Sequence, residues 1–144
     1  MRLDYLQKPN EQWNERIPKS KEFPRHWKVT KSMFIRLSDK RMLIIPAGTI
    51  WDGASVPKWL WWLFKPIDEG ALGDLIHDQL WVNKETELKH FDFQIYEARK
   101  FADDERVNWR NSHAPNKKMK TKITNFVIRN IGGFFYSRQI NIPK

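Results

Sequence analysis

The sequence predicts a small α+β domain in which a β-hairpin is followed by three or four packed helices. Residues 27–50 are rich in β-branched and aromatic side chains, whereas apolar residues recur at helical spacing from residue 70 onward. The chain has 144 residues, of which 40% are hydrophobic, enough for one domain with a real core. We expect an extended arm over 1–26, a single domain over 27–137 and a tail over 138–144.

The N-terminal arm is expected because residues 1–26 carry Pro9, Pro18 and Pro24 among scattered aromatic residues. The hairpin follows directly. The segment WKVTKSMFIRL is typical of a strand, SDKR predicts a turn, and MLIIPAGTI predicts a second strand that Pro46 and Gly48 interrupt.

Two helices are expected next. Ser55 can cap a short helix with Pro57 in its first turn, where a missing N–H does no harm. A second helix is predicted over 70–82, because four apolar residues fall at helical spacing and form a stripe: Leu72, Leu75, Ile76 and Leu80.

The C-terminal part predicts two more helices. One covers 87–105 and ends before NSHAPN. The other runs from about Lys117 to Arg129 or on to Tyr136, and Gly132–Gly133 should bend or end it. The expected apolar side of this last helix consists of Ile123, Phe126, Val127, Ile131, Phe134 and Phe135.

The composition excludes several classes. The chain has no cysteine, which rules out a disulfide framework and thiolate chemistry. No apolar run approaches the roughly 20 residues that span a bilayer. The first residues, MRLDYLQKPNEQWNER, are polar, so we expect no signal peptide.

The net charge of +9 lies entirely at the C-terminal end. Residues 1–105 hold 17 basic and 17 acidic side chains, whereas residues 106–144 hold nine basic ones and no acidic one. This asymmetry predicts a polyanionic neighbour: nucleic acid, an anionic membrane surface or an acidic protein. The alternative is an ordinary terminal helix with a solvated basic face. The lysines that would bind a partner are Lys117, Lys118, Lys120 and Lys122.

The segment DLIHDQLW suggests a chemical site. A histidine can take a proton from water near neutral pH, and does so better when a carboxylate holds its far nitrogen. Adjacent residues on a helix point about 100° apart, so Asp78 is poorly placed to hold His77. Asp92, on the next helix, is better placed. The catalytic hypothesis therefore pairs His77 with Asp92, and the alternative is a buried structural hydrogen bond between the same two residues.

A metal is a second hypothesis for this region. Asp78 would be available to bind a divalent cation such as calcium, with Asp52 or a backbone carbonyl as a further ligand. Asp52 also has a local alternative, because its carboxylate can accept N–H groups of the turn that follows it.

Three ordered motifs resemble a known family. The segments IPAGTIWDGASVPKWLWWLF, LIHDQLW and FDFQIYEA are similar to the phage-associated family catalogued as domain of unknown function 1353, over about residues 44–98. Asp52, Ser55, Pro57, His77, Asp78 and Asp92 fall on its pattern. Trp81, Thr49 and Phe91 depart from it. The resemblance implies a phage or prophage origin more firmly than any reaction.

A weaker likeness concerns secreted, calcium-dependent phospholipases. There a His-Asp pair on one helix is completed by an aspartate on the antiparallel helix. By analogy His77 would activate water, Asp78 would bind calcium and Asp92 would orient the histidine. Those enzymes also need a Gly-rich calcium loop and usually disulfides, and neither is evident in this sequence.

Two functions follow as expectations. The first is a virion-associated accessory protein of the tail, neck or capsid, located in the particle or the host cytoplasm, which binds other phage structural proteins. Its arm needs a neighbour to bury against, and Trp59 and Trp62 are good interface anchors. The alternative is a small phage hydrolase with a His-Asp site, with or without the help of a metal, that cleaves envelope ester bonds during entry or lysis. Binding to nucleic acid is a third and weaker hypothesis.

Overall fold

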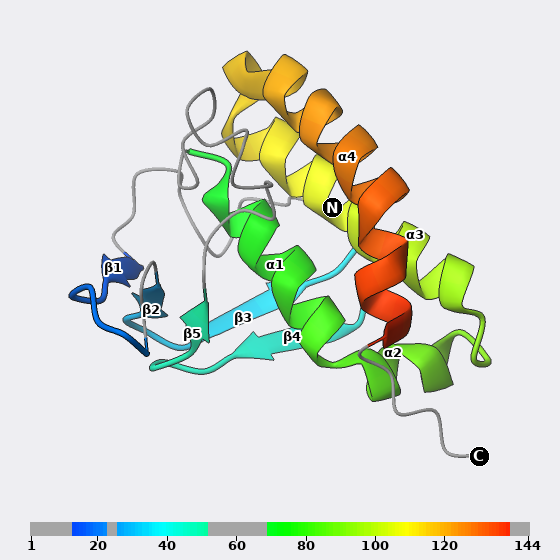
Figure 1. Ribbon diagram of the computed structural model, residues 1–144, viewed down its shortest axis with the longest axis horizontal. Helices are drawn as coiled ribbons and strands as arrows, with labels where there is room; N and C mark the ends of the chain where they lie inside the picture. Colours follow the sequence, from blue (N-terminus) through cyan, green and yellow to red (C-terminus); the bar gives the residue numbers. More distant parts are fainter. Residues whose placement is uncertain (1–12, 23–25, 52–68, 139–144) are drawn as a thin grey trace.

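The computed structural model describes residues 13–22, 26–51 and 69–138, with side chains up to residue 130. Within these residues, five short strands precede four helices (Figure 1). The strands are β1 (Asn14–Arg16), β2 (Trp27–Val29), β3 (Met33–Arg36), β4 (Met42–Ile45) and β5 (Ile50–Trp51). The helices are α1 (Ala71–Val82), α2 (Lys84–His90), α3 (Ile95–His113) and α4 (Lys118–Arg138), with a 3-10 turn at Pro115–Lys117. The predicted α+β class is confirmed.

The predicted hairpin is present, and each of its two strands is divided. Strands β3 and β4 pair antiparallel, as do β2 and β5, and β1 joins the other edge of β2. The two ladders have the same register. Trp27 pairs with Trp51 and Met33 pairs with Ile45, and the same number of residues separates these two pairs on each strand. The interruption includes Pro46, which has no N–H to donate, and Gly48, whose φ of 89° lies outside the strand region.

The turn of the hairpin is a three-residue loop, Ser38 to Lys40. Leu37 donates its N–H to the Arg41 carbonyl over 2.9 Å, which closes the loop, and Lys40 has a left-handed φ of 73°. The Glu105 carboxylate of α3 accepts hydrogen bonds from the Ser38 N–H, over 2.9 Å, and from its hydroxyl group. The loop is therefore fixed to α3 as well as to its own strands.

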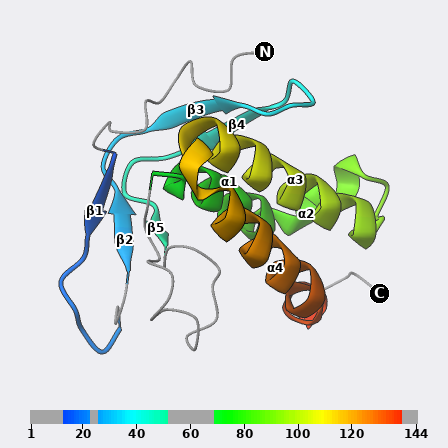
Figure 2. The ribbon, with the colours of Figure 1, turned by 90° about the horizontal axis from the view of Figure 1, so that it is seen from above.

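Helix α1 is central. Figure 2 shows the hairpin along one side of α1 and α3, with α4 on the other side. The inward face of the hairpin and the predicted stripe of α1 share one apolar core. The core members from the hairpin are Trp27, Val29, Met33, Ile35, Leu37, Leu43, Ile45 and Trp51. Trp13 also joins this core and stacks on Trp51, with ring centroids 6.1 Å apart.

The predicted helix over 87–105 is wrong. The chain forms α2, then a turn over residues 91–94, then α3. Asp92 and Phe93 adopt left-handed backbone angles, with φ of 52° and 62°, and these reverse the chain direction. The apolar residues Leu88, Phe91 and Ile95 keep helical spacing across the turn, so the pattern conceals the break.

The ends of the last two helices differ from expectation. Helix α3 continues to His113, into the NSHAPN segment, and stops before Pro115. Helix α4 continues to Arg138, so Gly132 and Gly133 do not end it.

Candidate functional site

His77 is bonded to Asp103 of α3, not to Asp92. The distance from its Nε2 atom to the Oδ1 atom of Asp103 is 2.8 Å, and each side chain is 2% exposed. The expected partner, Asp92, lies exposed in the turn between α2 and α3. The pairing with Asp92 is therefore wrong. Because the turn separates Asp92 from α3, the antiparallel course of α3 along α1 brings a later carboxylate opposite the histidine.

The surroundings of His77 keep it neutral. Burial lowers the pKa of His77 below 6.5, although the nearby Asp103 carboxylate opposes this shift. A neutral imidazole bonded in this way donates its Nε2–H to the carboxylate. Its ring also packs against Trp81, with centroids 4.9 Å apart. His77 therefore links α1 to α3. This geometry favours the alternative of a buried structural hydrogen bond, with Asp103 in place of Asp92 as the carboxylate partner.

One helical turn before His77, a buried ionic cluster joins three helices. Asp74 of α1 accepts hydrogen bonds from Arg106 Nε and Arg110 Nη1, both over 2.7 Å. The two guanidinium groups also donate to α4, Arg106 to the Thr124 hydroxyl over 2.6 Å and Arg110 to the Thr121 hydroxyl over 2.9 Å. All five side chains are buried. The two guanidinium charges share the Asp74 carboxylate and gain further hydrogen bonds from the threonines, which offsets the cost of burying them, while Arg106 Nη1 has no hydrogen-bond partner among the described residues.

Close helix contact makes this cluster possible. A Cβ atom on Gly73 would lie 2.8 Å from the backbone oxygen of Arg106, so only glycine fits where α1 meets α3. Sequence reasoning missed the cluster. The available signal was the spacing of Asp74 and His77 on α1 and of Asp103, Arg106 and Arg110 on α3, which places complementary groups on facing sides.

The metal hypothesis gains no ligand set from the structure. Within residues 13–22, 26–51 and 69–138, no three histidine, aspartate or glutamate side chains converge as metal ligands. Asp78 lies half-buried on α1. Asp52, Trp59 and Trp62 lie outside the described residues, so calcium binding stays a prediction.

Helix α4 is oriented opposite to the expected way. Ile123 and Phe126, which were predicted on its packed side, are exposed, whereas Thr121, Thr124 and Ile128 face the protein. The reason is the cluster: the threonine hydroxyls satisfy buried arginines, which isoleucine and phenylalanine cannot do. Among the candidate lysines, Lys118 and Lys122 are exposed, Lys117 is half-buried and Lys120 is buried.

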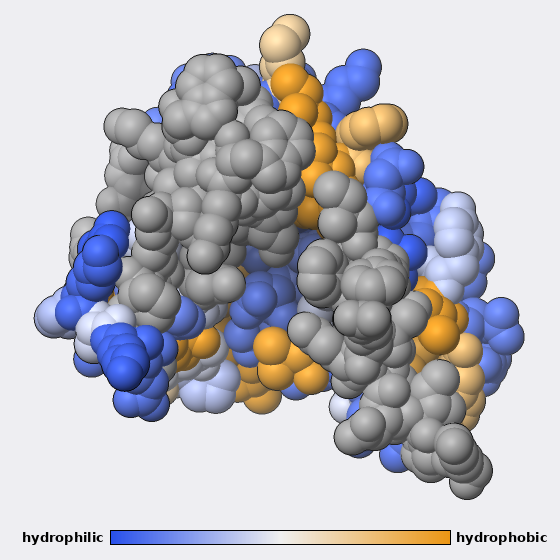
Figure 3. Space-filling model, in the orientation of Figure 1, coloured by the Kyte–Doolittle hydropathy of each residue, from blue (hydrophilic) through white to orange (hydrophobic). Residues whose placement is uncertain are grey.

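The outward face of the hairpin is largely apolar, and its charged members are Lys28 and Arg36. Phe34 and Ile44, directly opposite each other on β3 and β4, are 51% and 56% exposed, and Met42 and Ile50 are exposed too. On the opposite side of the molecule, hydrophobic atoms are visible over α4 (Figure 3). We call Phe34, Met42, Ile44 and Ile50 the hairpin patch.

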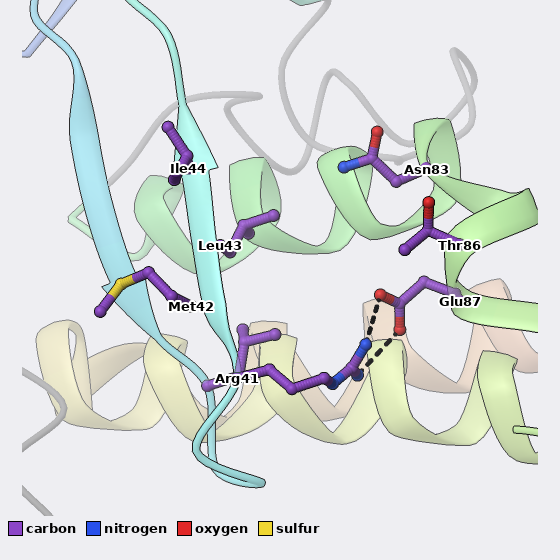
Figure 4. A pocket seen from close by; sticks show the side chains of 8 residues that line it. Arg41, Met42, Leu43, Ile44, Asn83, Thr86 and Glu87 are labelled. Atoms are coloured by element: carbon purple, nitrogen blue, oxygen red, sulfur yellow. Dashed lines mark hydrogen bonds and ion pairs between the residues drawn. The ribbon is translucent and has the colours of Figure 1, made fainter. Parts of the chain in front are cut away.

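A cavity of about 450 Å³ adjoins the hairpin patch. It lies between β4 and the segment where α1 gives way to α2 (Figure 4). Met42, Leu43 and Ile44 line one side, and Asn83 and Thr86 line the other. Arg41 closes one end through two hydrogen bonds to the Glu87 carboxylate, over 2.8 and 3.0 Å.

The fold and its contacts thus define a small α+β domain in which buried ion pairs and hydrogen bonds join α1, α3 and α4. The chain matches the family described as "Protein of unknown function (DUF1353)" over residues 27–112, and it belongs to that family. No curated protein and no solved structure matches the chain. Among the described helices, none is long and apolar enough to cross a membrane.

The family match covers only part of the described structure. Residues 27–112 run from the start of β2 to the penultimate residue of α3, so they include His77, Asp103 and the Asp74, Arg106 and Arg110 side chains of the cluster. Strand β1 and helix α4 lie outside the matched segment. The common domain is therefore the hairpin with α1 to α3, and α4 is packed onto it.

Proposed function

We propose that this protein is a virion-associated accessory protein of a bacteriophage, in the tail, neck or capsid, which acts by binding other structural proteins. The hairpin patch carries the proposal. In a two-stranded hairpin with one packed face, the outward residues are ordinarily polar. Here Phe34, Met42, Ile44 and Ile50 face outward instead. Clustered exposed apolar side chains typically mark a binding surface. The phage setting rests on the family resemblance.

The edge of β4 strengthens this argument. Leu37 and Arg41 form a hydrogen-bonded pair, so alternation along the ladder directs the backbone groups of Met42 and Ile44 away from β3. Among the described strands, none pairs with that edge. An extended segment of a partner can add to it and place side chains in the adjoining cavity.

The hydrolase alternative receives less support. A general base must reach substrate and solvent, whereas His77 is sealed and its Nε2 atom is engaged by Asp103. Asp92, its supposed partner, lies apart from it on the surface.

The experiment is to compare particles from phage carrying the wild-type gene with particles carrying Phe34→Ser and Ile44→Ser together. Quantitative mass spectrometry should find the wild-type chain in purified particles and at least about tenfold less of the double variant, the loss expected when two anchors of an interface are truncated. Tyr96→Ser, at an exposed aromatic residue of α3, is the matched control and should be incorporated normally. Absence of the wild-type chain from particles would refute the proposal.

A further inference from the structure

We propose that the outer side of α4 is a binding surface for an anionic phospholipid bilayer. Three apolar side chains project from this side: Met119, 76% exposed, Phe126, 70% exposed, and Ile123 between them. Their spacing of four and three residues places them on one face of the helix. The opposite face is occupied by α3, so this apolar stripe is turned outward by the cluster that fixes α4.

Basic side chains accompany the stripe. Lys118 and Lys122, one turn apart, are exposed beside Met119 and Ile123. Arg129 continues the row, 34% exposed, with its Nε atom 3.4 Å from Asp103. The sequence contains no acidic residue after Glu105, so α4 itself has no carboxylate, and the acidic side chains that pair with Arg129 are Asp103 and Asp104 of α3. The outer side of α4 therefore combines the apolar stripe with exposed positive charge from Lys118 and Lys122.

The two features together select the partner. The charge requires a polyanion, and a nucleic acid would satisfy it through phosphate contacts alone. Exposed methionine, isoleucine and phenylalanine gain nothing from phosphates, but they gain from an apolar interior. An anionic bilayer offers both within a few ångströms: charged headgroups for the lysines and acyl chains for the stripe. A bilayer surface can also deform around the convex face of α4, so binding requires no preformed groove.

The inference does not depend on the hairpin patch. Helix α4 lies outside the family match, and its outer side is separate from the cavity beside β4. A phage protein could therefore bind a partner through the hairpin and a membrane surface through α4.

The test uses the full chain and vesicles of phosphatidylcholine with or without phosphatidylserine. The chain should co-sediment with the serine-containing vesicles only, and binding should fall when NaCl is raised from about 0.1 M to about 1 M, where the screening length shrinks from about 10 Å to about 3 Å. Lys118→Gln with Lys122→Gln should weaken binding about 25-fold, since each lysine contributes about fivefold near such a surface. Lys84→Gln with Lys89→Gln is the matched charge control on α2.

A labelling experiment locates the contact. The chain has no cysteine, so Phe126→Cys can carry a single environment-sensitive fluorophore, with Tyr96→Cys as the control on α3. Anionic vesicles should shift the emission at position 126 to the blue and leave position 96 unchanged. No binding to anionic vesicles, equal shifts at both positions, or binding to duplex DNA alone with the same lysine dependence would each overturn the inference. Circular dichroism of every variant confirms that the fold is retained.

Discussion

Helix α1 packs against the hairpin on one side and against α3 on the other, and the two contacts differ in chemistry. The hairpin contact is apolar, formed by residues such as Ile35, Ile45 and Leu75. The α3 contact includes Asp74, Arg106, Arg110, His77 and Asp103, all buried. Apolar contacts are non-directional, whereas paired charges tolerate little displacement. The hairpin side therefore supplies hydrophobic stability, and the α3 side fixes the register of the helices.

The largest expected effect comes from breaking the ionic contact. Asp74→Ala leaves two buried guanidinium groups without their carboxylate, which should lower the free energy of unfolding by about 3–5 kcal/mol in urea titrations. The control is Asp104→Ala, which removes an exposed carboxylate paired with Lys100 and should cost less than about 1 kcal/mol. Equal losses in both variants would mean that the buried cluster does not hold the helices together.

The histidine on the same side should make stability depend on pH. The folded pKa of His77 lies below 6.5, so the unfolded chain binds a proton more readily. The free energy of unfolding should therefore fall as the pH is lowered through about 6.5, the unfolded value. His77→Ala should cost about 1–3 kcal/mol near pH 8, because the buried Asp103 loses a donor.

The pH comparison between the two proteins isolates His77 from the other histidines. The variant should lose less stability than wild type between about pH 8 and about pH 5, because it no longer contains the group whose pKa is depressed. Chemical denaturation at each pH measures this difference. Parallel pH profiles would show that His77 is accessible enough to titrate normally in the folded protein.

The apolar contact can be tested with one substitution made on both faces of the hairpin. Ile35→Val, on the buried face, should cost about 0.5–1.5 kcal/mol. Ile44→Val, on the exposed face, should be nearly neutral in the isolated protein. A similar loss at both positions, measured by urea denaturation, would contradict the assignment of inner and outer faces.

The smallest effect concerns the loop between the strands. Lys40 holds a left-handed φ of 73°, which glycine adopts without steric cost. Lys40→Gly should raise the free energy of unfolding by about 0.5–1 kcal/mol. Lys28→Gly, on β2, should lower it instead, because glycine weakens a strand. Thermal denaturation of the two variants distinguishes these outcomes by the sign of the change.

The sequence predicted the apolar half of the molecule better than the ionic half. Alternation along the hairpin and the stripe Leu72, Leu75, Ile76 and Leu80 reflect burial directly, and all four of these side chains are buried. Such reasoning could not predict the register between α1 and α3, because a sequence does not distinguish a solvated charged residue from one in a buried ion pair. The turn at Asp92 and Phe93 contains neither glycine nor proline, the usual signals.

The orientation of α4 shows the same limit. Hydropathy places Ile123 and Phe126 inward, but the two threonines that accept from Arg106 and Arg110 decide which side is packed. Single-sequence patterns contain no information on which hydroxyl will meet which guanidinium group. The pairing of His77 with Asp92 was wrong for a related reason: it placed Asp92 in a helix over 87–105, whereas Asp92 lies in the turn before α3.

The divided hairpin restricts how this domain can evolve. Its two ladders keep a common register across the break at Pro46 and Gly48. Adding or removing one residue on a single strand would turn inner side chains outward and outer side chains inward between the interruption at Pro46 and Gly48 and the loop after Leu37. Length changes should therefore survive only as compensated pairs, one on each strand, or as insertions in the loop after Leu37.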